Sequence, residues 1–540
     1  MSRTLVIGWD GATWSVADPL CASGRLPALS SLREAGASGV LQTVPNMNSA
    51  PAWSTIATGV NPGRHGIFYF DEPVPGTYQR RVVNAERRAA PSLWRMASDA
   101  GKRIIVVNVP ISYPAEPVKG FLISGLDTPS KSLPGFTYPR DLSARHAELF
   151  ESYIIEPGAP SLMRAGRRQE AVDKLLASVE GWVAVTERLM RDEEWDLTFV
   201  VFTSTDTAQH FFWTGEGRGV VERVYELQDE ATARLVELAR TQDPDTNVLV
   251  LADHGGAANT RGNEFMRIWL EDQGLQAQAR GSARSRVLAA GFRLADRTLS
   301  RDQKQALARR LPRLRQQAEA EARLSGIDWS RTRAYSDGVR DEIFVNLSGR
   351  EPQGIVGADG YPSLVAGLKE SIAGIRELGT GRPVVDSVVH RDDVYHGPYV
   401  DRAPDLTIRW VLDGPMQGFE VTSPRARDRM REAAAAPVFQ DGGHHPEGIL
   451  VASGPNVRPG AAAGDLTDVT PTILALLGVP VPSGLDGKPL DLLRGVAIEA
   501  GAATPGSPSG APARDVDETT GYTAEEEEAV RRRLEDLGYL

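Results

Sequence analysis

The sequence predicts an α/β protein with a mainly parallel sheet covered by helices on both faces. Short β-branched runs bounded by turn residues predict buried strands at residues 4–9, 103–109, 197–203, 247–252 and 448–452. Two amphipathic patterns between these runs, Gln169–Arg191 and Val220–Arg240, predict long helices. Continuous apolar strands that alternate with helices are typical of parallel sheets buried on both faces. In such sheets the reactive groups collect beyond the carboxyl ends of the strands.

The length and composition restrict the class of protein. The chain has 540 residues, a formal net charge of -11 and a single cysteine, Cys21. This length favours one large domain with additions, or two to three domains. The acidic balance argues against a nucleic-acid binder, so no stable nucleic-acid complex is expected. One cysteine excludes an internal disulfide, and nothing indicates an oxidising compartment.

No targeting or membrane segment is expected. The apolar run Leu5–Trp9 is too short for a secretory signal. No stretch approaches the roughly 20 apolar residues of a membrane helix. We therefore expect a cytoplasmic protein without a membrane span, and the sequence leaves its oligomeric state open.

The predicted core is interrupted by one insertion. Residues 1–274 and 336–496 are expected to form its two parts, and residues 275–335, which lack a strand pattern, a cap-like helical insertion. Between Arg280 and Arg315 the insertion carries eleven Lys or Arg residues against two acidic ones. This basic stretch fits either a solvated helical hairpin or a positive flap that attracts an anionic substrate.

The C-terminal region is expected to contain a linker and a docked helix. Residues 497–520 are rich in Pro and small residues, which predicts a flexible linker. Residues 521–540 predict a helix with a capping box from Thr523 to Glu526. Its apolar stripe consists of Val530, Leu534 and Leu537. Its two favourable i,i+4 pairs are Glu527/Arg531 and Glu528/Arg532. The stripe indicates that this helix packs against another part of the protein.

Acidic and histidine side chains stand at the ends of the predicted strands. They are Asp10, Asp206, His210, Asp253 and His254, with His444 and His445 in the loop before the last strand. Each alone has an ordinary explanation, such as an Asp that caps a helix. Together they place the same kinds of metal-binding side chain at several strand ends, and a doubly wound sheet would bring those ends to one edge. Carboxylate oxygen mixed with imidazole nitrogen suits Zn²⁺ first, with Mn²⁺ or Fe also plausible.

The segment NMNSAPAWSTIATG contains a candidate nucleophile. Pro51 fits the first turn of a helix, with Ser49 or Ala50 at its cap. A serine there points into the positive end of the helix, where backbone N–H groups can hold phosphate oxygens. The local sequence alone favours a plain capping role for Ser49.

Six motifs together resemble one known superfamily. They are IGWDG, SAPAWSTIATGVNPGRHGI, STDTAQH, LADHGG, HHPEGILVASGP and DLTDVTPTILALLGVPVPSGLDGKPL, in this order from residue 7 to about residue 491. The set resembles the alkaline phosphatase superfamily, and specifically its type I phosphodiesterase/nucleotide pyrophosphatase branch. The resemblance implies an alkaline-phosphatase-like, doubly wound fold and two divalent metal ions, Zn²⁺ before Mn²⁺. It also implies a small anionic phosphoester as the substrate.

The resemblance further implies a role for each site residue. One metal would be held by Asp206, His210 and His444, and the other by Asp10, Asp253 and His254, with Ser49 bridging toward it. Ser49 would be the nucleophile that forms a phosphoseryl intermediate. His444 is preferred over His445 because the family's last histidine stands two residues before the PEG-like turn. His65 matches a position that is usually structural.

The chain departs from the family pattern after the HGI motif. Many nucleotide-cleaving members carry an Asn there, and Phe70 stands in its place. This puts nucleotide diester specificity in question, although Asn46, Asn48 or backbone N–H groups could supply the missing donor. Asn48, Trp53 and Phe70 are the candidate substrate-binding residues. A sulfatase is disfavoured because Trp53 stands where its motif requires Arg.

The leading functional hypothesis is hydrolysis of phosphodiesters or phosphoanhydrides. A phosphomonoesterase with the same metals and nucleophile is the alternative. A catalytically silent phosphoester-binding protein is a third possibility, which the complete ligand set counts against. The lack of a membrane span counts against a fourth possibility, a membrane- or polymer-associated headgroup transferase.

Overall fold

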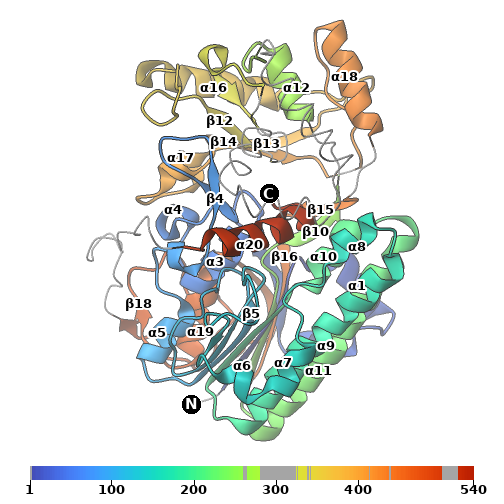
Figure 1. The fold of residues 1–540 in the computed structure, drawn as a ribbon. Helices are drawn as coiled ribbons and strands as arrows, with labels where there is room; N and C mark the ends of the chain where they lie inside the picture. Colours follow the sequence, from blue (N-terminus) through green and yellow to red (C-terminus); the bar gives the residue numbers. More distant parts are fainter. Residues whose placement is uncertain are drawn as a thin grey trace.

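The protein is built around a nine-stranded sheet with the order β17-β2-β16-β9-β1-β8-β5-β6-β7 (Figure 1). The computed structural model describes residues 3–259, 264–279, 324, 326–336, 340, 342–412, 414–436, 440–501 and 521–540. The strands of the sheet are β1 (Thr4–Trp9), β2 (Ala37–Gln42), β5 (Ile104–Val109), β6 (Gly120–Ser124), β7 (Thr137–Tyr138), β8 (Leu197–Phe202), β9 (Asn247–Leu251), β16 (Glu447–Ser453) and β17 (Gly460–Asp465). All five predicted strands are present, as β1, β5, β8, β9 and β16.

The sheet is mainly parallel, as predicted, and β16 is an informative exception. Strand β1 pairs in parallel with β8 and β9, and β5 pairs in parallel with β8 and β6. Strand β16 runs antiparallel to both β9 and β2, and β7 runs antiparallel to β6. The amino end of β16 therefore lies at the same rim as the carboxyl ends of β1, β8 and β9. Residues just before β16 can reach that rim.

Helices cover both faces of the sheet. One face packs against α1 (Trp14–Ala22), α2 (Pro27–Ala35), α9 (Arg168–Asp192) and α11 (Arg218–Gln242), and the other against α3 (Ser49–Thr58), α5 (Leu93–Asp99) and α19 (Val469–Leu476). In β1, Leu5 and Ile7 belong to the first face and Val6 to the second, as the two-residue period of a strand requires. Helix α3 approaches the sheet at Gly8, where an added Cβ would lie 2.5 Å from the Trp53 ring. The predicted helices correspond to α9 and α11.

A second unit lies beyond the rim of the sheet, at the top of Figure 1. Its antiparallel sheet has the order β11-β12-β14-β13, with β11 (Ala334–Tyr335), β12 (Glu342–Val345), β13 (Val385–His390) and β14 (Leu406–Trp410). Helices α12 (Phe265–Asp272), α16 (Tyr361–Ala373) and α18 (Pro424–Ala435) complete it, and its hydrophobic cluster runs from Phe265 to Met430.

This unit differs from the expected division of the chain. Residues 342–430 were expected in the second part of the main core, but they pack with α12 around a separate sheet. Short strands show the same alternation in either sheet, so the pattern could not assign them. Residues 280–323 of the expected insertion lie outside the described residues. Residues 502–520 of the expected linker also lie outside them.

The C-terminal helix α20 (Ala524–Leu537) docks on the main unit (Figure 1). The predicted capping box between Thr523 and Glu526 is present, and so are both i,i+4 ion pairs. The apolar stripe packs in a cluster that includes Phe70. The remaining helices and strands are α4 (Pro62–His65), β3 (Asp71–Pro73), β4 (Arg80–Val82), α6 (Leu142–Arg145), α7 (Ala147–Ser152), α8 (Ala159–Arg164), α10 (Ser204–Phe212), β10 (Gly255–Ala258), α17 (Arg391–Val394), β15 (Gly442–His445), β18 (Val481–Pro482) and β19 (Ala500–Gly501).

Candidate active site

Three carboxylates meet where β1, β8 and β9 end. Asp10 follows β1, Asp206 lies in the first turn of α10 after β8, and Asp253 comes shortly after β9. Their exposed fractions are 1%, 3% and 0%, so all three are buried together. Burial raises the pKa of Asp10 well above its usual value, and the charges of Asp253 and Asp206 raise it further. The pKa of Asp253 is raised too, first by burial. These surroundings therefore oppose the ionisation of Asp10 and Asp253.

Histidines complete two groups of side chains around these carboxylates. In one group, the Asp206 Oδ1 atom lies 3.4 Å from His210 Nε2 and 3.5 Å from His444 Nε2. The two imidazoles are 3.0 Å apart at Nε2. In the other group, His254 Nε2 lies 3.3 Å from Asp253 Oδ2 and 3.8 Å from Asp10 Oδ1. The rings of His254 and His444 are 4.1 Å apart, so the groups adjoin.

Backbone carbonyls orient two of the imidazoles. His210 Nδ1 lies 3.2 Å from the Gly442 carbonyl oxygen, and His254 Nδ1 lies 3.1 Å from that of Gly255. A proton on Nδ1 in each ring would leave Nε2 as the lone-pair atom that faces the carboxylates. Burial, together with the nearby His444, lowers the pKa of His254 to about 3, so this imidazole is neutral. Neutral imidazole is the form that binds metal ions.

The pKa of Asp206 is shifted in the opposite direction. Burial alone would raise it, but the adjacent His210 and His444 hold it well below its usual value. Burial would lower the pKa of His210, and the Asp206 carboxylate raises it instead. Asp206 is therefore the one carboxylate of the three that has an imidazole partner strong enough to keep it ionised.

The donor set fits divalent cations. Two trios have ligand atoms within 4.8 Å of one another, Asp206 with His254 and His444, and Asp10 with Asp253 and His254. His254 thus belongs to both trios, and His210 is adjacent to the first. Asp10 Oδ1 and Asp253 Oδ2 are buried without a hydrogen-bond partner. Because an unpaired buried carboxylate oxygen is costly, these atoms indicate positions that a bound cation would satisfy.

Ser49 lies beside these groups and is not the helix cap. Helix α3 begins at Ser49, and the cap is Asn48, whose Oδ1 accepts a hydrogen bond from the Ala50 N–H at 3.1 Å. This corrects the expected cap at Ser49 or Ala50; Asn is a strong N-cap, and the boundary moved by one residue. The buried Ser49 Oγ lies 3.1 Å from His254 Nε2, at the positive end of α3.

Two of the candidate substrate-binding residues do not face open space. The Trp53 side chain is fully buried, and its Nε1 donates a hydrogen bond to Asp10 Oδ2 at 2.9 Å. Phe70 is also fully buried, and its ring lies 4.8 Å from that of Tyr539. Trp53 therefore positions a carboxylate, and Phe70 supports another side chain. Asn48 uses its carbonyl oxygen for the cap, so only its amide N–H groups remain for a substrate.

Three neighbouring polar residues have hydrogen-bond partners outside the two groups. His65 is fully buried, and its Nε2 lies 3.0 Å from Thr55 Oγ1, as expected of a structural residue. The side-chain amide of Asn46 uses one of its two N–H groups to donate to the Phe68 carbonyl oxygen at 2.5 Å. His445 Nδ1 accepts from the Glu447 N–H, so this one of its two ring nitrogens is engaged by its own turn.

Three contributors to the site were not predicted from the sequence. The Gly11 N–H donates to Asp253 Oδ1 at 3.2 Å, and Gln209 Nε2 donates to the Gly11 carbonyl oxygen at 2.7 Å. Tyr539 Oη donates to Asp206 Oδ2 at 2.6 Å. Gly11 and Gln209 stand beside predicted ligands in the sequence, so proximity could have indicated them. Tyr539 is 333 residues from Asp206, and no local pattern could have indicated it.

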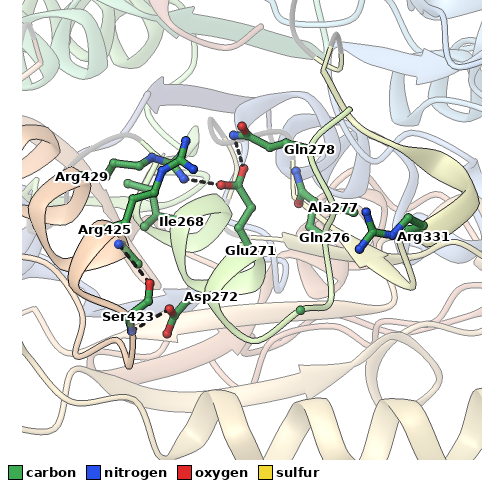
Figure 2. Close-up of a pocket in the computed structure, with 12 residues that line it drawn as sticks. Ile268, Glu271, Asp272, Gln276, Ala277, Gln278, Arg331, Ser423, Arg425 and Arg429 are labelled. Carbon is green, nitrogen blue, oxygen red and sulfur yellow. Dashed lines mark hydrogen bonds and ion pairs between the residues drawn. The ribbon is translucent and has the colours of Figure 1, made fainter. Parts of the chain in front are cut away.

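A separate cavity of about 330 Å³ lies in the second unit, between α12 and α18 (Figure 2). Its two acidic side chains both have partners. Glu271 pairs with Arg429, and Asp272 accepts hydrogen bonds from the Thr422 and Ser423 N–H groups before α18. None of the predicted site residues lines this cavity.

The fold and the site define an α/β protein in which a serine at a helix start adjoins buried carboxylate–imidazole groups. The sequence model of the type I phosphodiesterase / nucleotide pyrophosphatase family matches residues 4–413. The chain therefore belongs to this family, and it is by class a phosphoester hydrolase whose site contains side-chain groups that could hold a metal ion. No curated protein sequence matches the chain significantly.

Several solved structures are similar at low sequence identity. Phosphonoacetate hydrolase from Sinorhizobium meliloti 1021, in complex with phosphonoformate, is 16% identical with a TM-score of 0.48, over 84% of this chain and 89% of that chain. Murine ectonucleotide pyrophosphatase / phosphodiesterase 5 is 13% identical with a TM-score of 0.48, over 91% and 100%. A variant of alkaline phosphatase PafA is 14% identical with a TM-score of 0.49, over 92% and 99%. In the part of the chain that the structure describes, every helix is too short or too polar to span a bilayer.

Proposed function

We propose that this chain is a two-metal hydrolase of phosphodiesters or phosphoanhydrides that uses Ser49 as its nucleophile. The observation that carries the proposal is the position of Ser49 Oγ, 3.1 Å from His254 Nε2 and buried beside three carboxylates. The hydroxyl is not needed to cap α3, because Asn48 already does so. The expected cytoplasmic location remains a prediction.

The two groups of side chains suit two ions. One ion would be held by Asp206, His210 and His444, and the other by Asp10, Asp253 and His254, with Ser49 as a further ligand. Mixed oxygen and nitrogen donors favour Zn²⁺, with Mn²⁺ as the alternative. When bound, such ions lower the pKa of a nearby hydroxyl and stabilise the negative charge of a phosphoryl group.

The residues of the chain determine the course of the reaction. The Ser49 Oγ atom attacks phosphorus, a P–Oγ bond forms, the bond from phosphorus to the leaving oxygen breaks, and the proton of Ser49 passes through solvent to that oxygen. The Ser49 N–H at the positive end of α3 is suited to hold a non-bridging oxygen, because the Ala50 N–H already donates to Asn48 Oδ1 and Pro51 has no N–H. Water then attacks the phosphoserine phosphorus, the P–Oγ bond breaks, and Ser49 recovers a proton. Trp53 and the Gly255 carbonyl keep Asp10 and His254 in position throughout.

A substrate panel tests the proposed function. The purified zinc-loaded protein is offered an aryl phosphomonoester, an aryl phosphodiester and a nucleotide ester, with Ser49→Ala as the control. We expect the diester or the nucleotide ester to be hydrolysed fastest, and Ser49→Ala to lose nearly all turnover. A clear preference for the monoester would overturn the assignment to diesters and anhydrides. Absence of turnover on all three by fully loaded protein would overturn the proposal.

A further inference from the structure

The penultimate residue of the chain reaches the centre of the active site. Tyr539 is 8% exposed, and its Oη donates to Asp206 Oδ2 at 2.6 Å. Its ring lies 6.3 Å from that of His210. The Ser49 hydroxyl is a second hydrogen-bonding neighbour of this phenol. The phenol therefore lies between the nucleophile and a proposed metal ligand.

This position coincides with the space that a substrate must use. A phosphorus atom under attack by Ser49 has to lie within bonding reach of Oγ, and its non-bridging oxygens extend a short distance further. A hydroxyl that neighbours both Ser49 and Asp206 borders that space.

The tail that carries Tyr539 is a fixed part of the main unit. Val530, Leu534 and Leu537 are buried in the cluster with Phe70, and the final Leu540 is 5% exposed. Polar contacts add to this packing, because Arg533 Nη1 donates to the carbonyl oxygens of Leu126 and Thr128, both at 2.6 Å.

Further contacts hold the end of the helix. Gln440 Nε2 donates to the Leu537 carbonyl oxygen at 2.6 Å, and Arg164 pairs with Asp536. Removing the tail from the site would expose the apolar stripe and break these hydrogen bonds together. The arrangement therefore favours a permanent wall of the site over a removable plug.

The ring of Tyr539 also rests on the residue where the family pattern is altered. Phe70 occupies the position at which many nucleotide-cleaving members carry a donor Asn, and the two rings are 4.8 Å apart. An apolar side chain cannot donate a hydrogen bond, but it can support an aromatic ring that does. The phenol of Tyr539 thus places a hydrogen-bond donor beside a ring that carries none.

We infer that Tyr539 contacts the substrate and turns its single O–H from Asp206 Oδ2 to donate a hydrogen bond to a non-bridging oxygen of the phosphoryl group. The inference rests on the proposed function, because it takes Ser49 as the attacking group. It gives the C-terminal tail a direct part in recognising the phosphoryl group.

The test compares Tyr539→Phe with a matched control in the same tail. Tyr522→Phe also removes one buried phenol hydroxyl, but that hydroxyl donates to the Asp127 carbonyl oxygen at 2.6 Å, and its ring stacks on Tyr113. Both substitutions are made in the full-length, zinc-loaded protein and in a Ser49→Ala background. Metal content is measured by elemental analysis, and binding of inorganic phosphate to the Ser49→Ala proteins by calorimetry.

We expect Tyr539→Phe to keep its metal content and to weaken phosphate binding roughly tenfold, as loss of a hydrogen bond to a charged group implies. In the Ser49 protein, kcat/KM should fall roughly 10- to 100-fold, with Tyr522→Phe within about twofold of wild type. Equal behaviour of the two variants, or loss of metal from Tyr539→Phe alone, would overturn the inference. A rise in activity or in phosphate affinity would identify a plug and overturn it too. Phosphate binding that depends on Tyr539 without any turnover would contradict the proposed function and still support this inference.

Discussion

Replacing Trp53 with Phe is expected to weaken metal binding without touching a metal ligand. The Trp53 Nε1 atom donates to Asp10 Oδ2 at 2.9 Å, and the other oxygen of this carboxylate already lacks a hydrogen-bond partner. Phe fills most of the space beside Gly8 but carries no donor. Loss of a hydrogen bond to a charged, buried group costs about 1.5–3 kcal/mol of stability. Loss of a group that orients a ligand lowers metal affinity about 10- to 100-fold.

The assay for this prediction uses a second buried tryptophan as its control. Trp182 is fully buried, and its Nε1 donates to the Ile154 carbonyl oxygen at 2.9 Å, away from the carboxylates. Trp182→Phe should lower the stability to thermal unfolding but retain zinc in competition with a chelator. Trp53→Phe should lose zinc at a lower chelator concentration. Equal zinc affinity in the two variants would refute the reasoning that Trp53 holds Asp10 for the metal.

Three further outcomes are expected. His444→Ala should reduce the bound metal measured by elemental analysis, whereas His445→Ala should leave it unchanged, because His444 is the one of these two that lies 3.5 Å from Asp206. The reverse result would exchange their roles. Zinc binding should release protons and weaken as the pH falls, because the raised pKa values of Asp10 and Asp253 make protons compete with zinc for their oxygens. Calorimetry in two buffers of different ionisation enthalpy should show the proton release, and an identical heat in both buffers would contradict it. Gly11→Ala should destabilise the protein by roughly 1–2 kcal/mol in urea unfolding, because Gly11 has a φ of +70° and an added Cβ would lie 3.1 Å from Asp206. Unchanged stability would show that the turn tolerates a side chain.

The sequence predicted the parts of this site that depend on local pattern. Asp10, Asp206 and Asp253 follow strands that are mostly apolar, and the rule for parallel sheets brings the carboxyl ends of these strands to one rim. His444 reaches the same rim because β16 runs antiparallel, which the sequence did not indicate. The family resemblance, and not the spacing, assigned each of these residues to a metal.

Long-range packing decided what the sequence could not predict. Trp53 was a candidate for substrate contact, but the close approach of α3 at Gly8 turns its indole toward Asp10. Residues 342–430 have ordinary strand patterns, and only tertiary structure shows that they form a separate sheet. Tyr539 reaches Asp206 through the docking of α20, for which the apolar stripe predicted a contact but no partner.

The central claim is that Ser49 becomes covalently phosphorylated during turnover, and acid quenching tests it most directly. The zinc-loaded protein is mixed with its best substrate from the panel and quenched in acid within the first turnovers. Peptides are then analysed by mass spectrometry. The account predicts a phosphorylated peptide with the modification on Ser49, absent from Ser49→Ala and from protein treated with a chelator. Rapid turnover with no phosphoserine at any quench time, or wild-type turnover by Ser49→Ala, would contradict it.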